Sequence, residues 1–208
     1  MRSISRSIGL AALVIATGSC GDVVRQGRSP VYLVIATLQG AQGNHPTALG
    51  GNLLSDVLTI VTTGGVCSQA NPCPTIFNDV GSVTLRLALK DIGTAANPTT
   101  PTTNDEVTIT RYRVTYRRAD GRNEPGVDVP FAFDGAATAT VPASGTLTVG
   151  FEIVRHVAKQ ESPLAQLVTN GSIITTLADV TFYGKDRVGN DISVTGTIQI
   201  DFGNFGDS

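Results

Sequence analysis

The chain has 208 residues and a formal net charge of −2, from 15 Lys and Arg against 17 Asp and Glu. That length allows one β domain or two small ones, and we expect one. The lack of a basic excess argues against a nucleic-acid partner, which would need a clustered basic face. The chain contains no Trp, which argues against a carbohydrate-binding face because sugars are usually bound by exposed flat aromatic rings.

The first twenty residues have the pattern of an export signal. Arg2 and Arg6 form a short basic head, residues 8–16 are an apolar run, and the small residues Gly18 and Ser19 follow. A helix that spans a bilayer needs about 20 apolar residues, so this run is too short to cross a membrane. A basic head, a short apolar run and small residues are together typical of a secretory signal peptide.

The signal ends at Cys20 and resembles the lipobox of bacterial lipoproteins, in which two small residues precede the cysteine. Thr17 stands where the lipobox usually has Leu, Val or Ile. The resemblance implies that residues 1–19 are removed and that Cys20 carries lipid. It also implies attachment to the outer membrane, because Gly21 follows where Asp would signal retention at the inner membrane. The alternative is an ordinary secretory peptide that leaves Cys20 as a spare thiol.

Removal of residues 1–19 would leave 13 basic and 17 acidic residues, a formal net charge of −4. Residues 20–30 are the expected tether, which spans at most about 35 Å when fully extended. Residues 31–208 are the expected folded domain. That domain would therefore lie close to the membrane surface, facing either the periplasm or the exterior.

Cys67 and Cys73 lie close together in the sequence. Export to an oxidising compartment favours a disulfide between them, and closing so short a loop would contribute about 2 kcal/mol on the chain-entropy model. Metal binding is the alternative, but two thiols at this spacing lack a second pair of ligands, and His45 and His156 have no ligand spacing to them. We therefore expect a disulfide, and no metal or cofactor.

The first half of the mature chain predicts three strands separated by loops. Residues 31–38 are a continuous apolar run, which suits a strand covered on both faces, and residues 53–63 are the next strand. In residues 82–90 apolar and polar side chains alternate, as in a strand with one buried face. Residues 39–52 are rich in glycine and read as a loop, and residues 92–105 are a loop with nothing to bury.

Residues 106–118 contain a Tyr-x-Val-x-Tyr pattern that runs from Tyr112 to Tyr116. This pattern resembles the third strand of fibronectin type III and related immunoglobulin-like domains. The apolar positions change from odd to even numbers near Thr110, so we expect a β-bulge or bend there.

Further alternating runs follow in the second half of the chain. Residues 129–133 and 137–141 are apolar at every second position, and Asp134 with Gly135 predicts a hairpin turn between them. Residues 145–154 form another strand with one apolar face.

A short helix and a hairpin complete the predicted elements. Ser162 and Pro163 can begin a brief helix that Asn170 and Gly171 would stop, and the last two strands are joined by a turn at residues 186–191. About seven to nine strands without any long helical period predict an all-β fold, a single antiparallel immunoglobulin-like β-sandwich with one short helix.

Two loops are rich in the hard oxygen ligands that suit Ca²⁺. Neither loop has the spacing of an EF-hand, and the alternative is that these side chains form turns by bonding to their own backbone. The weak candidate ligands are Asp120, Asn123, Glu124 and Asp128 in one loop, and Asp186, Asn190 and Asp191 in the other.

Arg111, Arg113 and Arg117 fall on one side of the predicted strand at residues 106–118. They could present a basic stripe to an anionic polymer or a lipid headgroup. The alternative, which we favour, is a solvated outer face whose arginines meet acidic neighbours such as Glu152 or Asp179.

The sequence contains no recognisable catalytic motif, and no serine has a Gly-x-Ser-x-Gly context. We therefore expect a non-enzymatic envelope lipoprotein that displays its domain for binding or structural work, with residues 39–52 and 92–105 as the candidate binding loops. One alternative is an accessory subunit of an envelope secretion or transport complex, which would bind a protein. Another is an enzyme whose active site assembles only in space.

Overall fold

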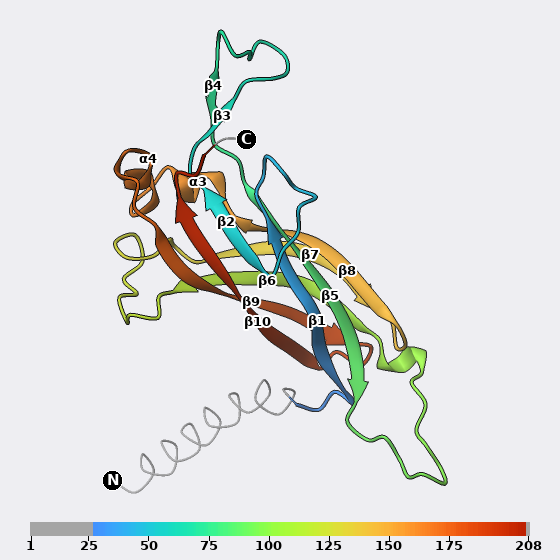
Figure 1. The fold of residues 1–208 in the computed structure, drawn as a ribbon. Coiled ribbons are helices and arrows are strands. Elements are labelled where there is room, and N and C mark those ends of the chain that lie inside the picture. The colour runs from blue at the N-terminus through green and yellow to red at the C-terminus, as the bar shows by residue number, and fades with distance from the viewer. Residues whose placement is uncertain (1–26, 207–208) are drawn as a thin grey trace, which may run out of the picture.

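Two β-sheets packed against each other make up most of the molecule (Figure 1). The structure is a computed structural model that describes residues 27–206. The predicted signal segment and Cys20 lie outside the described residues. Within the described residues helices are short and strands dominate, so the predicted all-β class is confirmed.

The smaller sheet has three antiparallel strands in the order β1–β5–β8. Their bounds are β1 (Val31–Ala41), β5 (Asp79–Leu89) and β8 (Thr146–Val154). The alternation predicted for β5 and β8 buries one face of each, including Val83 and Ile153. β1 differs from the prediction of a strand covered on both faces, because Tyr32 points to solvent.

The larger sheet has five strands in the order β2–β10–β9–β6–β7. Their bounds are β2 (Asn52–Asp56), β10 (Asp191–Gly203), β9 (Ile174–Asp186), β6 (Val107–Arg117) and β7 (Phe133–Val141). β9 and β10 form the predicted terminal hairpin. β2 pairs with residues 199–203 of β10 in parallel, so the prediction of a purely antiparallel fold is wrong at this edge.

β6 and β7 show one confirmed and one incorrect prediction. The register of β6 against both neighbours shifts between Ile109 and Arg111, which confirms the predicted bulge. The turn predicted at Asp134 and Gly135 is wrong, because both residues lie inside β7 and pair with β6. The ring of Tyr112 lies so close over Gly135 that a side chain there would collide with it. Gly135 is thus required for close packing and not for a turn.

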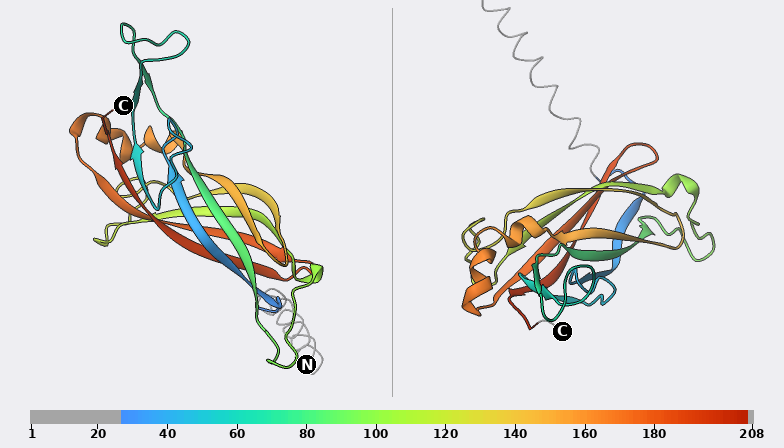
Figure 2. Two further views of the ribbon diagram at one scale, coloured as in Figure 1. Left: turned by 45° about the vertical axis from the view of Figure 1, so that its right-hand side comes forward. Right: turned by 90° about the horizontal axis from the view of Figure 1, so that it is seen from above.

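A two-stranded sheet projects from the sandwich and forms an arm, residues 58–78 (Figures 1 and 2). It contains β3 (Thr59–Val61) and β4 (Cys73–Thr75). The sequence predicted one strand over residues 53–63, but β2 ends at Asp56. The carboxylate of Asp56 accepts hydrogen bonds from the Leu58 N–H at 3.4 Å and the Thr59 hydroxyl at 2.9 Å. These bonds lie where the chain leaves the five-stranded sheet and enters the arm.

Short helical segments lie between β8 and β9, where the sequence predicts one brief helix. They are α3 (His156–Lys159), η2 (Leu164–Gln166) and α4 (Leu167–Asn170), while η1 (Thr103–Asp105) precedes β6. Gly171 adopts φ 57° and ends α4 as predicted, since a left-handed residue after a helix favours glycine. Ser162 does not cap η2, because that helix has no side-chain cap.

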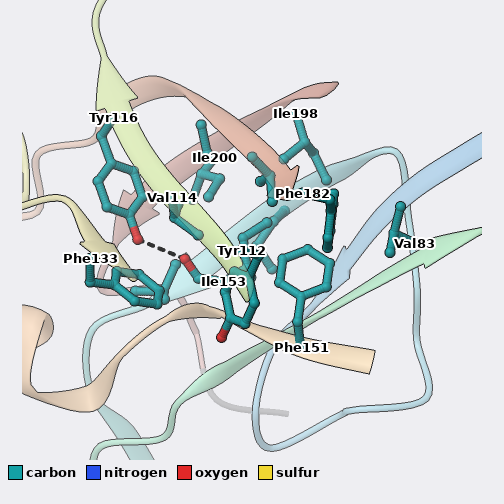
Figure 3. Close-up of a cluster of buried hydrophobic side chains, with 14 of the residues drawn as sticks. Val83, Tyr112, Val114, Tyr116, Phe133, Phe151, Ile153, Phe182, Ile198 and Ile200 are labelled. Carbon is teal, nitrogen blue, oxygen red and sulfur yellow. Dashed lines mark hydrogen bonds between the residues drawn. The ribbon is translucent and has the colours of Figure 1, made fainter. Parts of the chain in front are cut away.

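Aromatic rings fill the centre of the sandwich (Figure 3). Phe151 meets Tyr112 and Phe182 edge to face, with ring centroids 5.2 and 5.3 Å apart. Such pairs contribute about 0.5–1.5 kcal/mol beyond their buried area. Tyr116 donates a hydrogen bond of 2.6 Å to the carbonyl of Ile153 and so joins the two sheets, and burial raises the pKa of Tyr116.

The strands run between two ends of the sandwich, which carry different loops and turns. The tether end, where the described chain begins, carries the start of β1, the loop at residues 90–106 and the turns β7–β8 and β9–β10. The far end carries the arm and three further segments, residues 42–51, 118–132 and 155–173 (Figure 2).

Candidate binding surface at the far end

The two candidate binding loops leave the sandwich at opposite ends. β1 and β5 are antiparallel neighbours, so the loop after β1 lies at the far end and the loop after β5 lies at the tether end (Figure 1). Residues 39–52 and 92–105 therefore do not lie together in one surface. The far end instead combines residues 42–51 with the arm and the helical segments.

The arm is closed at its tip by the predicted disulfide between Cys67 and Cys73. Its two strands pair up to Val61 and Cys73, so the cross-link lies directly beyond the ladder. No residue of the arm carries a charge, and Val66 near the tip is 84% exposed. The arm therefore presents a neutral, cross-linked hairpin beyond the surface of the sandwich.

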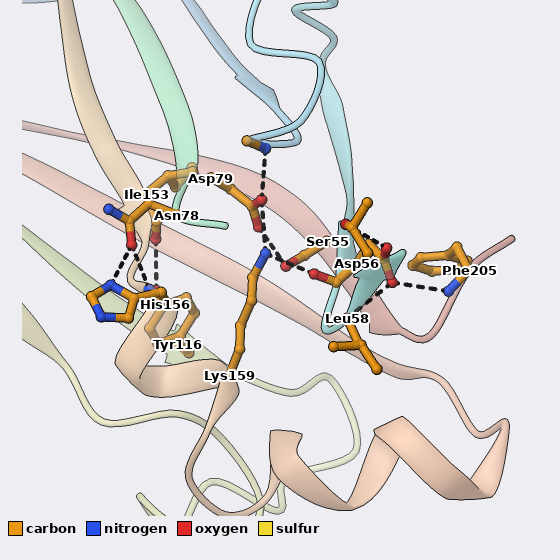
Figure 4. Close-up of polar contacts among 12 residues, drawn as sticks. Ser55, Asp56, Leu58, Asn78, Asp79, Tyr116, Ile153, His156, Lys159 and Phe205 are labelled. Atoms are coloured by element: carbon orange, nitrogen blue, oxygen red, sulfur yellow. Dashed lines mark hydrogen bonds and ion pairs between the residues drawn. The ribbon is translucent and has the colours of Figure 1, made fainter. Parts of the chain in front are cut away.

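A buried ion pair lies beneath the far end, at the root of the arm (Figure 4). The ammonium of Lys159, on α3, is 2.8 Å from the Asp79 carboxylate at the start of β5. The same ammonium donates to the backbone carbonyl of Asp56 at 2.8 Å. Both charged side chains are 1% exposed, so the pair is sealed from solvent and joins α3 to both sheets.

Asp79 collects two further donors. The hydroxyl of Ser55 donates to it at 2.5 Å and the backbone N–H of Gly43 at 3.1 Å. Burial raises the pKa of Asp79 above its ordinary value, while the charge of Lys159 and the hydrogen bonds oppose that rise. A buried carboxylate is tolerated only when its lone pairs are satisfied, and here the donors come from β2, α3 and residues 42–51. Asp79 thus fixes three far-end segments to one point.

Asp56 extends this network to the arm and to the end of the chain. In addition to Leu58 and Thr59, its carboxylate accepts the backbone N–H of Phe205 at 3.1 Å. The N–H of Val57 also donates to the carbonyl of Gly203 at 2.9 Å. The root of the arm is therefore held between β10 and the buried ion pair.

The two histidines have separate structural partners. The ring Nδ1 of His156 lies 2.8 Å from the side-chain oxygen of Asn78, which also accepts the His156 backbone N–H at 2.7 Å. The backbone of His45 bonds within its own loop, with Gln42 and Ala48. These contacts orient the first residue of α3 and the loop at residues 42–51, and they do not bring the two rings into one constellation.

A cleft of about 610 Å³ separates the loop at residues 42–51 from the root of the arm. His45 lines one side, and Thr59, Val61 and Phe77 line the other. The cleft walls thus combine apolar side chains with hydroxyls, a composition that suits a neutral segment of a protein partner better than a charged ligand.

Most of the large apolar side chains that remain exposed lie at the far end. They are distributed over the arm and over residues 42–51, 118–132 and 155–173. The members at this end are Leu49, Val66, Val127, Phe131, Val157 and Ile173.

Three of the four candidate calcium ligands in the first loop, Asp120, Asn123 and Asp128, have side-chain oxygens that accept hydrogen bonds from protein donors. Asp120 is 2.7 Å from Arg118 and 2.8 Å from Arg122, and hydrogen bonds from these guanidinium groups lower the pKa of Asp120. The side-chain oxygen of Asn123 accepts the N–H of Arg118, and Asp128 accepts that of Glu124. These contacts agree with the alternative given above, in which the polar side chains of this loop stabilise its turns.

The second candidate loop, the β9–β10 turn, is organised in the same way. Asp186 accepts the backbone N–H of Val188 and of Asn190 and also the side-chain amide of Asn190. Asp191 pairs with Lys185 at 2.6 Å. Among residues 27–206, no three acidic, His or Cys side chains are grouped as a metal site.

The three arginines of the predicted stripe do lie on the outer face of β6, and each meets a carboxylate. Arg117 pairs with Asp179 at 2.7 Å as expected. Arg111 and Arg113 share Asp134, at 2.9 and 2.7 Å, so the expected partner Glu152 is wrong for them. Asp134 is available because it lies in β7 beside β6 and not in a turn.

The residues of the buried network were missed at the level of sequence, although a signal exists. Asp79 has the same alternation phase as the buried residues Val83 and Leu85 of β5, and Ser55 has the phase of Leu53 in β2. A polar residue at a buried phase demands a partner. No comparable signal identifies Lys159, whose α3 has only one turn.

Comparison of the chain with models of known protein families and with curated proteins finds no match. In the part of the chain that the structure describes, no helix is long and apolar enough to traverse a bilayer. The assignment of function therefore depends on the sequence signal and on the geometry of the two ends.

Proposed function

We propose that this protein is a non-enzymatic lipoprotein of the bacterial envelope, anchored through lipid on Cys20, that binds a protein partner with the far end of an immunoglobulin-like sandwich. The anchor is supported by the basic head, the apolar run and the small residues before Cys20. Export is further supported by the disulfide between Cys67 and Cys73, since structural disulfides persist in oxidising compartments.

The immunoglobulin-like assignment is supported by the order of the strands. Immunoglobulin domains place their first, second and fifth strands in one sheet and their third, sixth and seventh strands in the other. With the arm and β2 set aside, β1, β5 and β8 occupy the first set, and β6, β9 and β10 occupy the second. β7 and β2 extend the second sheet at its two edges.

The observation that carries the proposal is the separation of the two ends. The described chain begins at the tether end, and the neutral arm projects from the far end (Figure 2). The cleft at the root of the arm and most exposed apolar side chains also lie at the far end. An anchor at the start of the chain would therefore direct these features away from the membrane, where a partner can reach them.

Site-specific photo-crosslinking in cells tests the binding end. Val66 on the arm and Val188 in the β9–β10 turn are a matched pair, because they are 84% and 80% exposed and lie at opposite ends. We expect a photoreactive residue at position 66 to capture a protein partner and the same residue at position 188 to capture none. Equal capture at both positions, or none at 66, would contradict a far-end binding surface.

Intact mass analysis of the mature protein tests the anchor separately. We expect the N-terminal residue to be Cys20 bearing acyl chains, and the Cys20→Ser variant to lack them. A single partner at equal stoichiometry in the crosslinking experiment would favour the accessory-subunit form of this function.

A further inference from the structure

The tether end contains a groove of about 550 Å³ that the far-end function does not use. It lies between the first residues of β1 and the β9–β10 hairpin, with β6 contributing Arg111. Gly27, the first described residue, forms part of its wall. The backbone carbonyl of Gly27 accepts a hydrogen bond of 2.8 Å from the ammonium of Lys90. The groove is therefore adjacent to the point where the tether joins the domain.

The rim of this groove carries an excess of positive charge, although the chain is acidic overall. The groove lining contains three cations, Lys90, Arg111 and Lys185, and one carboxylate, Asp191. That carboxylate pairs with Lys185. Arg111 shares its carboxylate partner, Asp134, with a second arginine, and the partner of Lys90 is a neutral carbonyl. The groove thus favours an anion.

Two of the four tyrosines in the chain line the same groove. The guanidinium of Arg111 lies 3.7 Å from the ring centre of Tyr183, and the Lys90 ammonium lies 5.0 Å from that of Tyr32. Tyr32 is 59% exposed. Tyrosine rings and flanking cations together are typical of protein surfaces at the headgroup level of a membrane.

Exposed aliphatic side chains accompany these groups at the tether end. Ile92, just after β5, is 74% exposed, and Val188, which follows Lys185 and precedes Asp191 in the β9–β10 turn, is 80% exposed. Surfaces that lie in the membrane interface combine apolar side chains with Lys and Arg, because the first enter the acyl boundary and the second meet anionic lipid.

We propose that this groove binds the phosphate headgroup of an anionic phospholipid in the membrane that holds the tether. The inference rests on the proposed anchor at Cys20. Seven residue steps separate Cys20 from Gly27 and span at most about 25 Å, so an anchored chain holds the groove within reach of the headgroups. Lipid binding here would orient the sandwich with its tether end against the bilayer and its arm outward.

Titration of the purified, cell-processed protein with short-chain soluble lipids tests the groove without a bilayer. We expect dihexanoyl phosphatidylglycerol to bind at least about tenfold more tightly than dihexanoyl phosphatidylcholine, because only the first carries net negative charge. The Lys90→Gln/Lys185→Gln variant should remove this preference. The charge-matched control Arg117→Gln/Arg122→Gln, which removes two exposed cations outside the groove, should retain it.

Equal binding of the two lipids, or an unchanged preference in the Lys90→Gln/Lys185→Gln variant, would overturn the proposal. Inorganic phosphate that binds as tightly as phosphatidylglycerol would also overturn it, because the ligand would then be free phosphate. The N-terminal mass of the same sample reports the anchor independently. An acylated protein without lipid preference would refute the groove alone, and an unacylated protein with that preference would refute the anchor alone.

Discussion

The two ends of this sandwich solve different structural problems. At the far end, several long segments leave the sheets, and one buried carboxylate, Asp79, receives donors from two of them, α3 and residues 42–51, and from Ser55 of β2. At the tether end, β7–β8 and β9–β10 are joined by short turns, and the charged side chains around the groove remain at the surface. The long segments of the far end are thus tied to an internal polar group, whereas the tight turns of the tether end keep their ion pairs at the surface.

Two buried aspartates express the same difference. Burial pushes the pKa of both upward. At Asp79, burial outweighs the charge and hydrogen bonds of its partners, and the pKa is raised. At Asp186, in the β9–β10 turn, hydrogen bonds from Asn190 and Val188 outweigh burial, and the pKa is lowered. The carboxylate of Asp186, which accepts hydrogen bonds within a turn, is stabilised in its charged state. For Asp79, which joins distant segments, burial makes the charged state less favourable.

The largest expected effect comes from breaking the buried ion pair. Lys159→Met removes the cation that offsets the buried Asp79 carboxylate, so we expect a loss of about 3–5 kcal/mol in the free energy of unfolding. Urea denaturation measures this loss. The exposed-pair control Arg113→Ala should cost less than about 1 kcal/mol.

A second variant separates the pair from simple packing. Lys159→Met combined with Asp79→Leu should lose less than the sum of the two single variants, because no charge is left alone in the interior. Strictly additive losses would show that the two charges do not interact, and the proposed anchoring of the far end would then be wrong.

The centre of the sandwich provides a reference that belongs to neither end. Gly135→Ala would place a methyl group against the ring of Tyr112, and overpacking of this kind costs about 1–3 kcal/mol. Combination with Tyr112→Leu should relieve part of the cost, because the ring is the colliding group. Thermal unfolding of the single and double variants measures both values, and an unchanged Gly135→Ala stability would contradict the close approach.

The disulfide should have a local effect, because the arm lies outside the core. Replacing Cys67 and Cys73 with Ser frees the tip in both the folded and unfolded chain, so we expect the global free energy of unfolding to change by less than about 1 kcal/mol. Hydrogen exchange should nevertheless become faster in β3 and β4 and remain unchanged in β9. A large global loss would instead place the arm within the cooperative unit of the sandwich.

The smallest expected effect is a pair of opposite pH dependences. Asp186 has a lowered pKa, so its contribution to stability is present above the ordinary value of 3.8 and is lost as the pH falls below it. The stability difference between wild type and Asp186→Asn should therefore shrink on acidification. Asp79 has a raised pKa, so its contribution falls as the pH rises above 3.8. Urea unfolding from pH 3 to 6 measures the stability difference between wild type and each of Asp186→Asn and Asp79→Leu. The contrast would be refuted if these two differences changed in the same direction with pH.

The strands of the sandwich were largely predictable because their alternation reflects burial on one face. β5, β8 and β10 followed the period of two, and the change of phase near Thr110 located the bulge in β6. The parallel pairing of β2 with β10 was not predictable, because a strand of five residues has the same pattern in either direction. The prediction of a turn at Asp134 and Gly135 was wrong because glycine occurs both in turns and where another group packs closely against the backbone. Only the position of the Tyr112 ring shows that the second case applies here.

The candidate sites were less predictable than the fold, for a physical reason. The disulfide followed from two nearby cysteines and the predicted export signal, both local features of the sequence. The partners of Asp79 are separated from it by 80 and 24 residues in the chain, so only the packed sheets bring them together. The position of the loop at residues 42–51 likewise depended on the direction of β1, which sets the end of the molecule at which it emerges.

The neutrality of the arm has a consequence for proteolysis. From residue 29 to residue 85 the chain contains no Lys or Arg, so trypsin-like enzymes have no cleavage site in the arm, even when it is unfolded. Proteases that recognise apolar or small side chains find Val61, Val66 and Phe77 there. In a compartment rich in proteases, the lifetime of this projection is therefore set by elastase-like and chymotrypsin-like activities.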